Sequence, residues 1–174
     1  MNERGLFYSF SYFRKSSLIA EKLIKELYRK PSTYRLGRFA EFMFLTGTHI
    51  GEAIEIQAKD FDFENSQAFV NGSIDRSGEY RIGIKGSVKT NASYRNLDIT
   101  NRTLCLVKRT IEEVTWDSME NDKFENLNYL FVTKNRVPVQ NNSFNLALKR
   151  ADERVDLAHK IYHLIFFAIR TFRG

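Results

Sequence analysis

Hydrophobic residues in the first third of the chain recur at three- and four-residue spacing, the period of helices packed on a core. This spacing predicts a first helix over Ser17–Leu27, stopped by Lys30-Pro31. It predicts a second, well-buried helix over Thr33–Leu45, with Gly47 as the residue that stops it. A third, short helix is predicted from near Ile50 to Ile56. The chain is therefore expected to begin with three consecutive helices.

The period changes to two after Asp60, where phenylalanines and acidic residues alternate over Phe61–Glu64. Asn65-Ser66 supply a turn, so a β-hairpin is predicted here. Further strands are predicted over Tyr80–Ile84 and Tyr94–Ile99. The middle third is therefore expected to form one small antiparallel sheet of three or four strands.

The helical period returns in the last third. A helix capped by Thr100 or Asn101 is predicted through residue 114, followed by a short apolar stretch over Asn128–Thr133. A final helix is predicted from residue 142 or 143 to residue 155. The chain shows no internal repeat and no flexible linker. The expected fold class is mainly α with a small antiparallel β-sheet (α+β), in one domain.

The composition supports a folded domain with a basic surface. Of 174 residues, 43% are hydrophobic and 14% aromatic, more than a disordered segment carries. Twenty-seven Lys and Arg stand against 21 Asp and Glu, a formal net charge of +6. This balance favours nucleic acid as a partner.

Cysteine and histidine usage excludes several kinds of site. The single cysteine, Cys105, rules out an intramolecular disulfide and a cysteine zinc cage, and its apolar surroundings predict a small buried residue inside a helix. His49, His159 and His163 have no carboxylates at ligand spacing, so no metal site is expected. No apolar run is long enough to cross a membrane, and we expect a cytoplasmic protein.

Two segments carry the most specific pattern. The first is Leu45-Thr46-Gly47-Thr48-His49-Ile50-Gly51-Glu52, where one predicted helix runs into the next. The second is Lys89-Thr90-Asn91-Ala92-Ser93-Tyr94-Arg95-Asn96-Leu97-Asp98-Ile99, a polar hairpin tip that returns as a strand. In this order they resemble the catalytic domain of the tyrosine recombinases, the phage and transposon integrases. That family has a Thr-Gly-x-Arg-x-Gly-Glu helix junction and a Lys-Thr hairpin.

The resemblance extends from about Ser17 to Lys160. Asp60–Phe63, Tyr129–Phe131 and Lys149-Arg150 fit the same domain in the same order. We therefore expect a recombinase catalytic-like domain over residues 17–161, with a poorly matching lead-in over residues 1–16.

The resemblance implies DNA strand breakage and rejoining. In the family a tyrosine attacks a DNA phosphodiester, two arginines and a histidine hold the phosphate, and the hairpin lysine protonates the departing 5′ oxygen. Charge develops on the non-bridging oxygens during such a displacement, and planar guanidinium groups neutralise it at two points. The poor alkoxide leaving group needs a positioned proton donor. The resemblance also implies that this chemistry needs no metal ion and no nucleotide, so no cofactor is expected.

Transferred by position, the family's site is incomplete in this chain. Lys89 occupies the hairpin lysine position, and Glu52 closes the helix junction, where we expect it to bond locally. His49 stands in place of the first arginine and lacks the guanidinium fork, which should slow phosphoryl transfer by orders of magnitude. His163 and Arg170 are alternative candidates for the family's His-x-x-Arg-His cluster, and no tyrosine follows either of them in this sequence.

Residues 162–174 depart from the family and suggest a frameshift. One set of codons for His163–Arg173 also spells His-Ile-Phe-Arg-His-Ser-His-Ile-Ser in another reading frame. That string contains the missing cluster at the expected place. We hypothesise a frameshift shortly after Ile161 that ends the chain early.

The leading interpretation is a truncated phage-integrase-type domain, from a prophage or other mobile element, that is catalytically impaired and at most binds DNA. The alternatives are a non-catalytic DNA-binding or assembly module that partners an intact recombinase subunit, and an unrelated helical protein with accidental motifs. The expected partner is double-stranded DNA, and the expected state in isolation is a monomer. Candidate phosphate contacts, besides Lys89, are Lys85, Arg95, Lys134, Arg136, Lys149 and Arg150.

Overall fold

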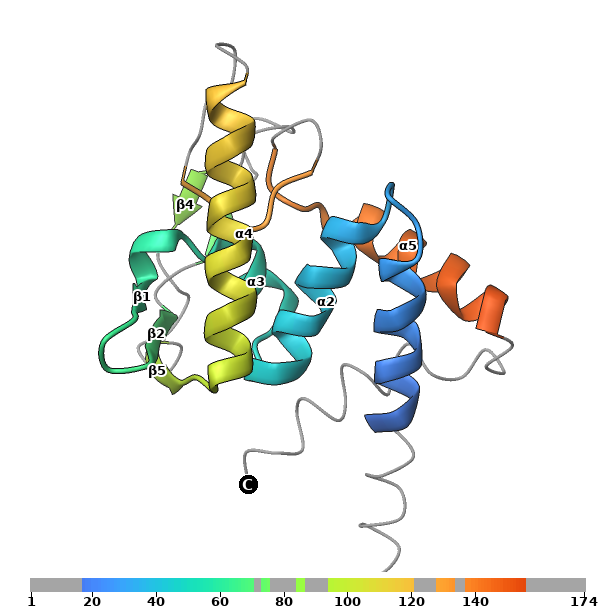
Figure 1. Cartoon of the computed structure of the whole chain (residues 1–174), viewed down its shortest axis with the longest axis horizontal. Helices are drawn as coiled ribbons and strands as arrows, with labels where there is room; N and C mark the ends of the chain where they lie inside the picture. The colour runs from blue at the N-terminus through green and yellow to red at the C-terminus, as the bar shows by residue number, and fades with distance from the viewer. Residues whose placement is uncertain are drawn as a thin grey trace, which may run out of the picture.

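The structure is a computed structural model, and it describes residues 17–70, 73–75, 84–86, 94–120, 128–133 and 137–155, with the backbone alone for 73–75 and 84–86. Within these ranges the chain is mainly helical with short antiparallel strands (Figure 1). The predicted α+β class with a small sheet is confirmed.

The three predicted N-terminal helices are present. Residues 17–28 form the first helix, followed by α2 (Tyr34–Thr46) and α3 (Ile50–Glu55). Gly47 ends α2 in the left-handed conformation, with φ 65° and ψ 22°, and its N–H donates to the Met43 carbonyl at 2.9 Å. Glycine adopts this conformation without the steric cost of a Cβ atom, so the sharp turn into α3 is encoded locally.

The strands form two sheets rather than the single sheet that the sequence predicts. After a 3₁₀ turn (η1, Ala58–Asp60), β1 (Phe61–Asp62), β2 (Gln67–Val70) and β5 (Arg95–Asp98) form an antiparallel sheet in the order β1-β2-β5. β3 (Ser73–Asp75) pairs separately with β4 (Ile84–Gly86).

This difference has a physical reason. Alternation indicates which residues are extended, but pairing is set by contacts between distant segments. Here β5 pairs with β2, which places Leu97 opposite Ala68 in the core. Most of the predicted strand over Tyr80–Ile84 lies outside the described residues, and the described strand begins at its last residue, Ile84.

The last two helices are α4 (Asn101–Met119) and α5 (Asn141–Val155). Thr100 caps α4 as predicted, because its hydroxyl oxygen accepts from the Thr103 N–H at 3.3 Å. α4 continues about one turn beyond the predicted end at residue 114.

The prediction that Cys105 is buried is wrong, because the side chain is exposed. The run around it is apolar and helical, but Cys105 lies on the far side of α4 from the buried stripe. That stripe consists of Thr103, Leu106, Val107, Thr110 and Val114.

An aromatic cluster joins the helices at the centre of the molecule. Phe39 and Phe42 of α2 are fully buried. The ring centroid of Phe39 lies 4.8 Å from that of Phe144 in α5 and 5.4 Å from that of Phe131. Edge-on aromatic pairs at these distances add to the free energy gained by burying the rings. Four phenylalanines therefore fix α2 against α5 and the 128–133 segment.

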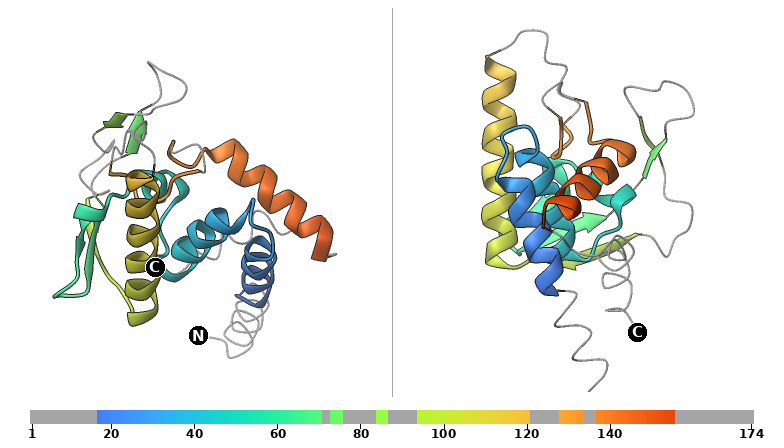
Figure 2. Two further views of the ribbon diagram at one scale, coloured as in Figure 1. Left: turned by 45° about the horizontal axis from the view of Figure 1, so that its top comes forward. Right: turned by 90° about the vertical axis from the view of Figure 1, so that its right-hand side faces the viewer.

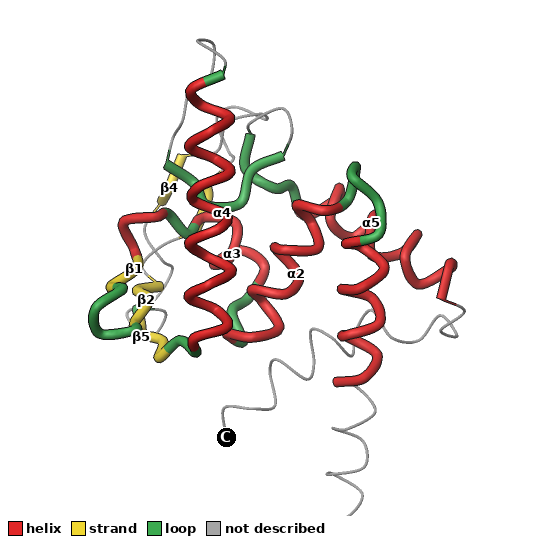
Figure 3. Tube along the Cα trace, in the orientation of Figure 1, coloured by secondary structure: helices red, strands yellow, loops and turns green. Residues whose placement is uncertain are grey.

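The strands and most of the other helices lie on opposite sides of α4. In Figure 1 the strands lie on one side of α4, and α2, the first helix and α5 lie on the other, an order that Figure 2 (left) repeats. Figure 3 shows the irregular segment 128–133 running between these two sides. The loop between α2 and α3 and the start of β5 therefore belong to the part of the molecule that connects helices to strands.

Candidate functional site

The loop between α2 and α3 is held by local hydrogen bonds. The Thr46 hydroxyl donates to the Phe42 carbonyl at 2.7 Å, and the hydroxyl oxygens of Thr46 and Thr48 lie 2.9 Å apart. Thr48 is fully buried, whereas His49 is exposed. Three consecutive small or β-branched residues, Thr46–Thr48, thus anchor the loop and leave His49 on the surface at the start of α3.

Glu52 fixes the backbone at position 49. Its Oε2 accepts from the backbone N–H of His49 at 2.8 Å. A glutamate at the third helical position satisfies the unpaired N–H at a helix start in this way. The local bond expected for Glu52 is therefore present.

The same carboxylate binds Arg95 of β5 at two points. One terminal nitrogen of Arg95 donates to Oε1 of Glu52 at 2.5 Å and the other to Oε2 at 2.6 Å. The Arg95 and Glu52 side chains are only 18% and 11% exposed. Such charge-assisted two-point contacts are strong and directional. The pair therefore joins the helix junction to the edge of the three-stranded sheet.

This geometry gives Arg95 a partner that the sequence-based expectation of a phosphate contact does not include. One N–H of each terminal nitrogen binds Glu52, so the carboxylate engages the guanidinium at two points and balances its charge. Its Nε is buried and has no hydrogen-bond partner among the described residues. Sequence reasoning missed the pair because 43 positions separate its members, and no local pattern links them.

The remaining predicted site residues are only partly described. Lys149 and Arg150 lie on the exposed side of α5. Lys85 lies in β4 opposite Ile74, with its backbone alone described. Five candidates, Lys89, Lys134, Arg136, His163 and Arg170, lie outside the described residues, as do the segments 1–16 and 162–174. The expected convergence of positions 49 and 89 with the tail thus stays a prediction.

A buried carboxylate positions α5 and its basic side. Glu26 in the first helix is nearly buried and accepts from Nε of Arg154 at 2.5 Å and from Arg29 at 3.0 Å. The hydrogen bond from Arg154 holds the pKa of Glu26 below its usual value. Lys149 and Arg150 are therefore carried by a helix that is anchored at its C-terminal end.

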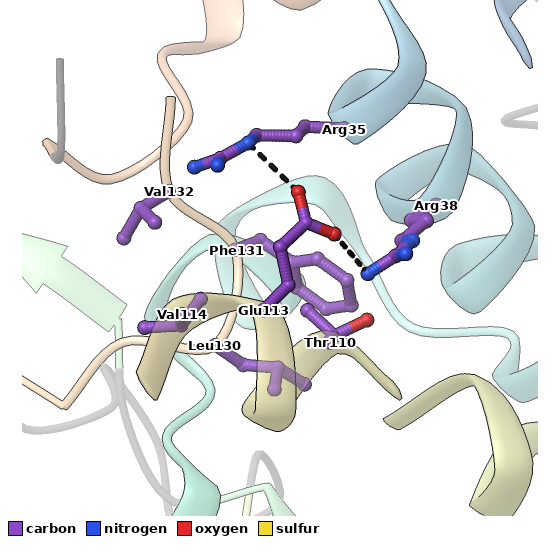
Figure 4. Close-up of a pocket in the computed structure, with 8 residues that line it drawn as sticks. All are labelled: Arg35, Arg38, Thr110, Glu113, Val114, Leu130, Phe131 and Val132. Atoms are coloured by element: carbon purple, nitrogen blue, oxygen red, sulfur yellow. Dashed lines mark ion pairs between the residues drawn. The ribbon is translucent and has the colours of Figure 1, made fainter. Parts of the chain in front are cut away.

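The pocket in Figure 4 lies between α2 and α4 and is not a good anion site. Arg35 and Arg38 line it, but Glu113 binds Arg35 Nε at 3.1 Å and Arg38 at 2.5 Å. Asp117 also binds Arg35. Two cations are thus neutralised by two carboxylates, and the cluster serves to fasten α4 to α2.

A second, partly buried network involves Tyr28 and Glu41. The Tyr28 hydroxyl donates to Glu41 at 2.5 Å, and Arg102 donates to the other oxygen of Glu41. Burial and the adjacent carboxylate raise the pKa of Tyr28 well above its usual value. This hydroxyl stays protonated as a donor and is a structural group.

The described residues contain no group of three histidine, cysteine or acidic side chains placed to hold a metal ion. In the same part of the chain, no helix combines the length and the apolar character needed to cross a membrane.

Comparisons with known proteins agree with this fold. A model of the phage integrase family matches residues 18–172. The chain is 35% identical over 144 residues to the prophage ps2 probable integrase of Lactococcus lactis subsp. lactis (strain IL1403), covering 83% of this chain and 37% of that protein. It is 29% identical over 122 residues to an integrase of Staphylococcus phage L54a, covering 70% of this chain and 34% of that protein. The chain thus spans about a third of the length of these relatives.

Solved structures show the same fold. The Tn1549 transposon integrase in complex with transposon right end DNA superposes with a TM-score of 0.67 at 18% identity, over 87% of this chain and 49% of that one. The XerA recombinase superposes with a TM-score of 0.59 at 18% identity, over 88% of this chain and 45% of that one.

Proposed function

The chain belongs to the phage integrase family, and we propose that it binds double-stranded DNA through the phosphate-binding part of a site-specific recombinase site in which strand cleavage is impaired. The arrangement at position 49 carries this proposal. Glu52 holds the backbone of His49 at the helix junction, at the position where the family has its first arginine. The scaffold for a phosphate ligand is thus retained while the ligand itself is changed.

The change at position 49 affects cleavage more than binding. An imidazole offers one donor per nitrogen, whereas a guanidinium presents a planar fork to two phosphate oxygens. Loss of a preorganised donor to developing charge lowers the rate by about a hundredfold to a thousandfold. Ground-state contacts with DNA phosphates depend on several cations and are less sensitive to one of them.

Basic side chains elsewhere in the chain supply the other proposed contacts with DNA phosphates. Lys149 and Arg150 are exposed on anchored α5, and Lys89 occupies the family's hairpin lysine position. Binding through phosphates is independent of base sequence and weakens steeply as salt concentration rises.

The test is a combined binding and cleavage assay on a nicked duplex DNA substrate across a salt series. We expect salt-sensitive binding without a covalent protein–DNA product, and weaker binding by Lys89→Ala. Lys59→Ala, which removes an exposed lysine in η1, is the matched control and should bind as the wild type does. A covalent product would contradict impaired cleavage, and absence of binding at low salt would contradict the proposed binding of DNA phosphates.

The variant His49→Arg sharpens the assay. Restoring the fork on the retained scaffold should tighten binding and steepen its dependence on salt, because an added phosphate contact contributes about one unit to the logarithmic slope. An unchanged slope would mean that position 49 does not face DNA.

The tail hypothesis is tested on the coding DNA. If a frameshift follows Ile161, the nucleotide sequence of that segment reads as a His-x-x-Arg-His string in another frame. A coding sequence without this alternative reading would exclude the frameshift.

A further inference from the structure

We infer that Arg95 is a positioning residue for DNA binding rather than a phosphate contact. It holds Glu52 at two points, and through Glu52 it fixes the backbone N–H of His49. It also neutralises a carboxylate beside the proposed phosphate site. This inference rests on the proposed function for its DNA-binding part.

The hydrogen bonds form a continuous chain from the sheet to position 49. Arg95 donates to both oxygens of Glu52, at 2.5 Å and 2.6 Å, and Oε2 also accepts from the His49 N–H at 2.8 Å. The shared oxygen means that a displacement of the guanidinium moves the acceptor of the His49 amide. Position 49 is therefore coupled to β5.

The three-stranded sheet fixes the backbone of Arg95. Arg95 lies opposite Val70 in the ladder of β2 and β5, and Leu97, two residues later, is buried against the core. A strand held by pairing and burial fixes the start of its arginine side chain better than a loop would. The junction thus takes its position from the core of the domain.

The charge of Arg95 has a second effect. The Glu52 side chain is 11% exposed and lies three residues from His49. Without Arg95, this carboxylate would present an uncompensated negative charge at a surface proposed to bind phosphates. An unpaired carboxylate left in a largely buried position also costs more than the pair contributes. Arg95 therefore aids binding without touching DNA.

A double-mutant cycle separates positioning from direct contact. With a mixed-sequence duplex DNA as the probe, Arg95→Gln should weaken binding about tenfold, the effect of a typical coupling within one network. Glu52→Gln/Arg95→Gln removes both charges and leaves an amide oxygen for the His49 N–H, so most of the affinity should return. The salt slope should stay close to that of the wild type in both variants.

A direct phosphate contact gives the opposite pattern. Arg95→Gln would then lower the salt slope by about one unit, and the double variant would bind as weakly as the single one. That result would overturn the inference.

Amide hydrogen exchange at His49 provides a readout that needs no DNA. Arg95→Gln should accelerate exchange of this amide, and the double variant should restore much of the protection. Arg102→Gln is the matched control, because it also removes one arginine from a glutamate, Glu41, but should leave the His49 amide unchanged. Unchanged exchange in Arg95→Gln would overturn the inference.

The readouts also separate this inference from the proposed function. If the wild type binds no DNA at low salt, the proposed function is wrong, and the exchange result still decides whether Arg95 positions residue 49. If Arg95→Gln does not fold, Arg95→Lys replaces it. Lysine keeps the charge but not the two-point contact. The exchange rate of the His49 amide in Arg95→Lys should therefore lie between that of the wild type and that expected when Glu52 has no cationic partner.

Discussion

The middle of α2 and its C-terminal end are held by different kinds of interaction. In the middle, Phe39 and Phe42 pack among aromatic rings and make no directional bonds. At the end, the turn at Gly47 leads to a junction that Glu52 and Arg95 fix through hydrogen bonds and opposite charges. Apolar packing determines where the helices lie and supplies most of the stability. The polar junction determines the orientation of the peptide N–H of His49. A binding site needs this kind of fixed orientation.

The aromatic cluster gives the largest expected effect. Phe39→Ala should lower the free energy of unfolding by about 4 kcal/mol, because it removes a fully buried ring and leaves a cavity among three others. Denaturant unfolding measures this loss, which should be nearly independent of salt. A loss below about 1 kcal/mol would mean that the cluster does not hold the helices together.

Breaking the polar junction should cost less stability but alter the site more. Glu52→Ala removes the acceptor for the His49 N–H and both contacts of Arg95, for an expected loss of about 2 kcal/mol. Denaturant unfolding and His49 amide exchange should be measured together. Loss of stability with unchanged exchange at His49 would contradict the difference drawn between the two regions.

Acid should weaken the carboxylate that anchors α5. The pKa of Glu26 in the folded state is lowered by Arg154, so its stabilising contribution is complete above the ordinary glutamate pKa. That contribution is lost as the pH falls below about 4. The stability difference between wild type and Glu26→Gln should therefore be largest at neutral pH and shrink in acid, as thermal unfolding across pH would show. If the stability difference between the wild type and Glu26→Gln grew in acid, the pKa of Glu26 would be raised in the folded state rather than lowered.

The smallest effect is expected outside both regions. Cys105→Ser should change the free energy of unfolding by less than about 0.5 kcal/mol, because the thiol is exposed on α4. In the folded wild type a thiol reagent should label Cys105 as readily as after unfolding. Protection of the thiol would show that this face of α4 is covered.

Sequence reasoning succeeded where the determinants are local. The turn at Gly47 and the Thr100 cap follow from residues within one helical turn of each other, and both are present. It failed where the outcome depends on distant segments. The apolar run around Cys105 predicts a helix, but only packing decides which side of that helix is buried.

The candidate site shows the same division. The bond from the His49 amide to Glu52 spans three residues and follows from the helix-start pattern, whereas the pair of Glu52 and Arg95 depends on how β5 meets α3. Arginine at position 95 is equally compatible, in sequence, with a surface cation and with a buried partner. The expectation for Lys89 stays a prediction.

The Glu52 carboxylate binds the main chain of residue 49, and every amino acid except proline offers the same N–H donor there. Since the genetic code separates histidine from arginine by a single base, one nucleotide change can exchange the side chain at this position while the main-chain bond to Glu52 remains available. A lineage can therefore exchange the side chain at this position, and later regain the original one, on the same main-chain framework.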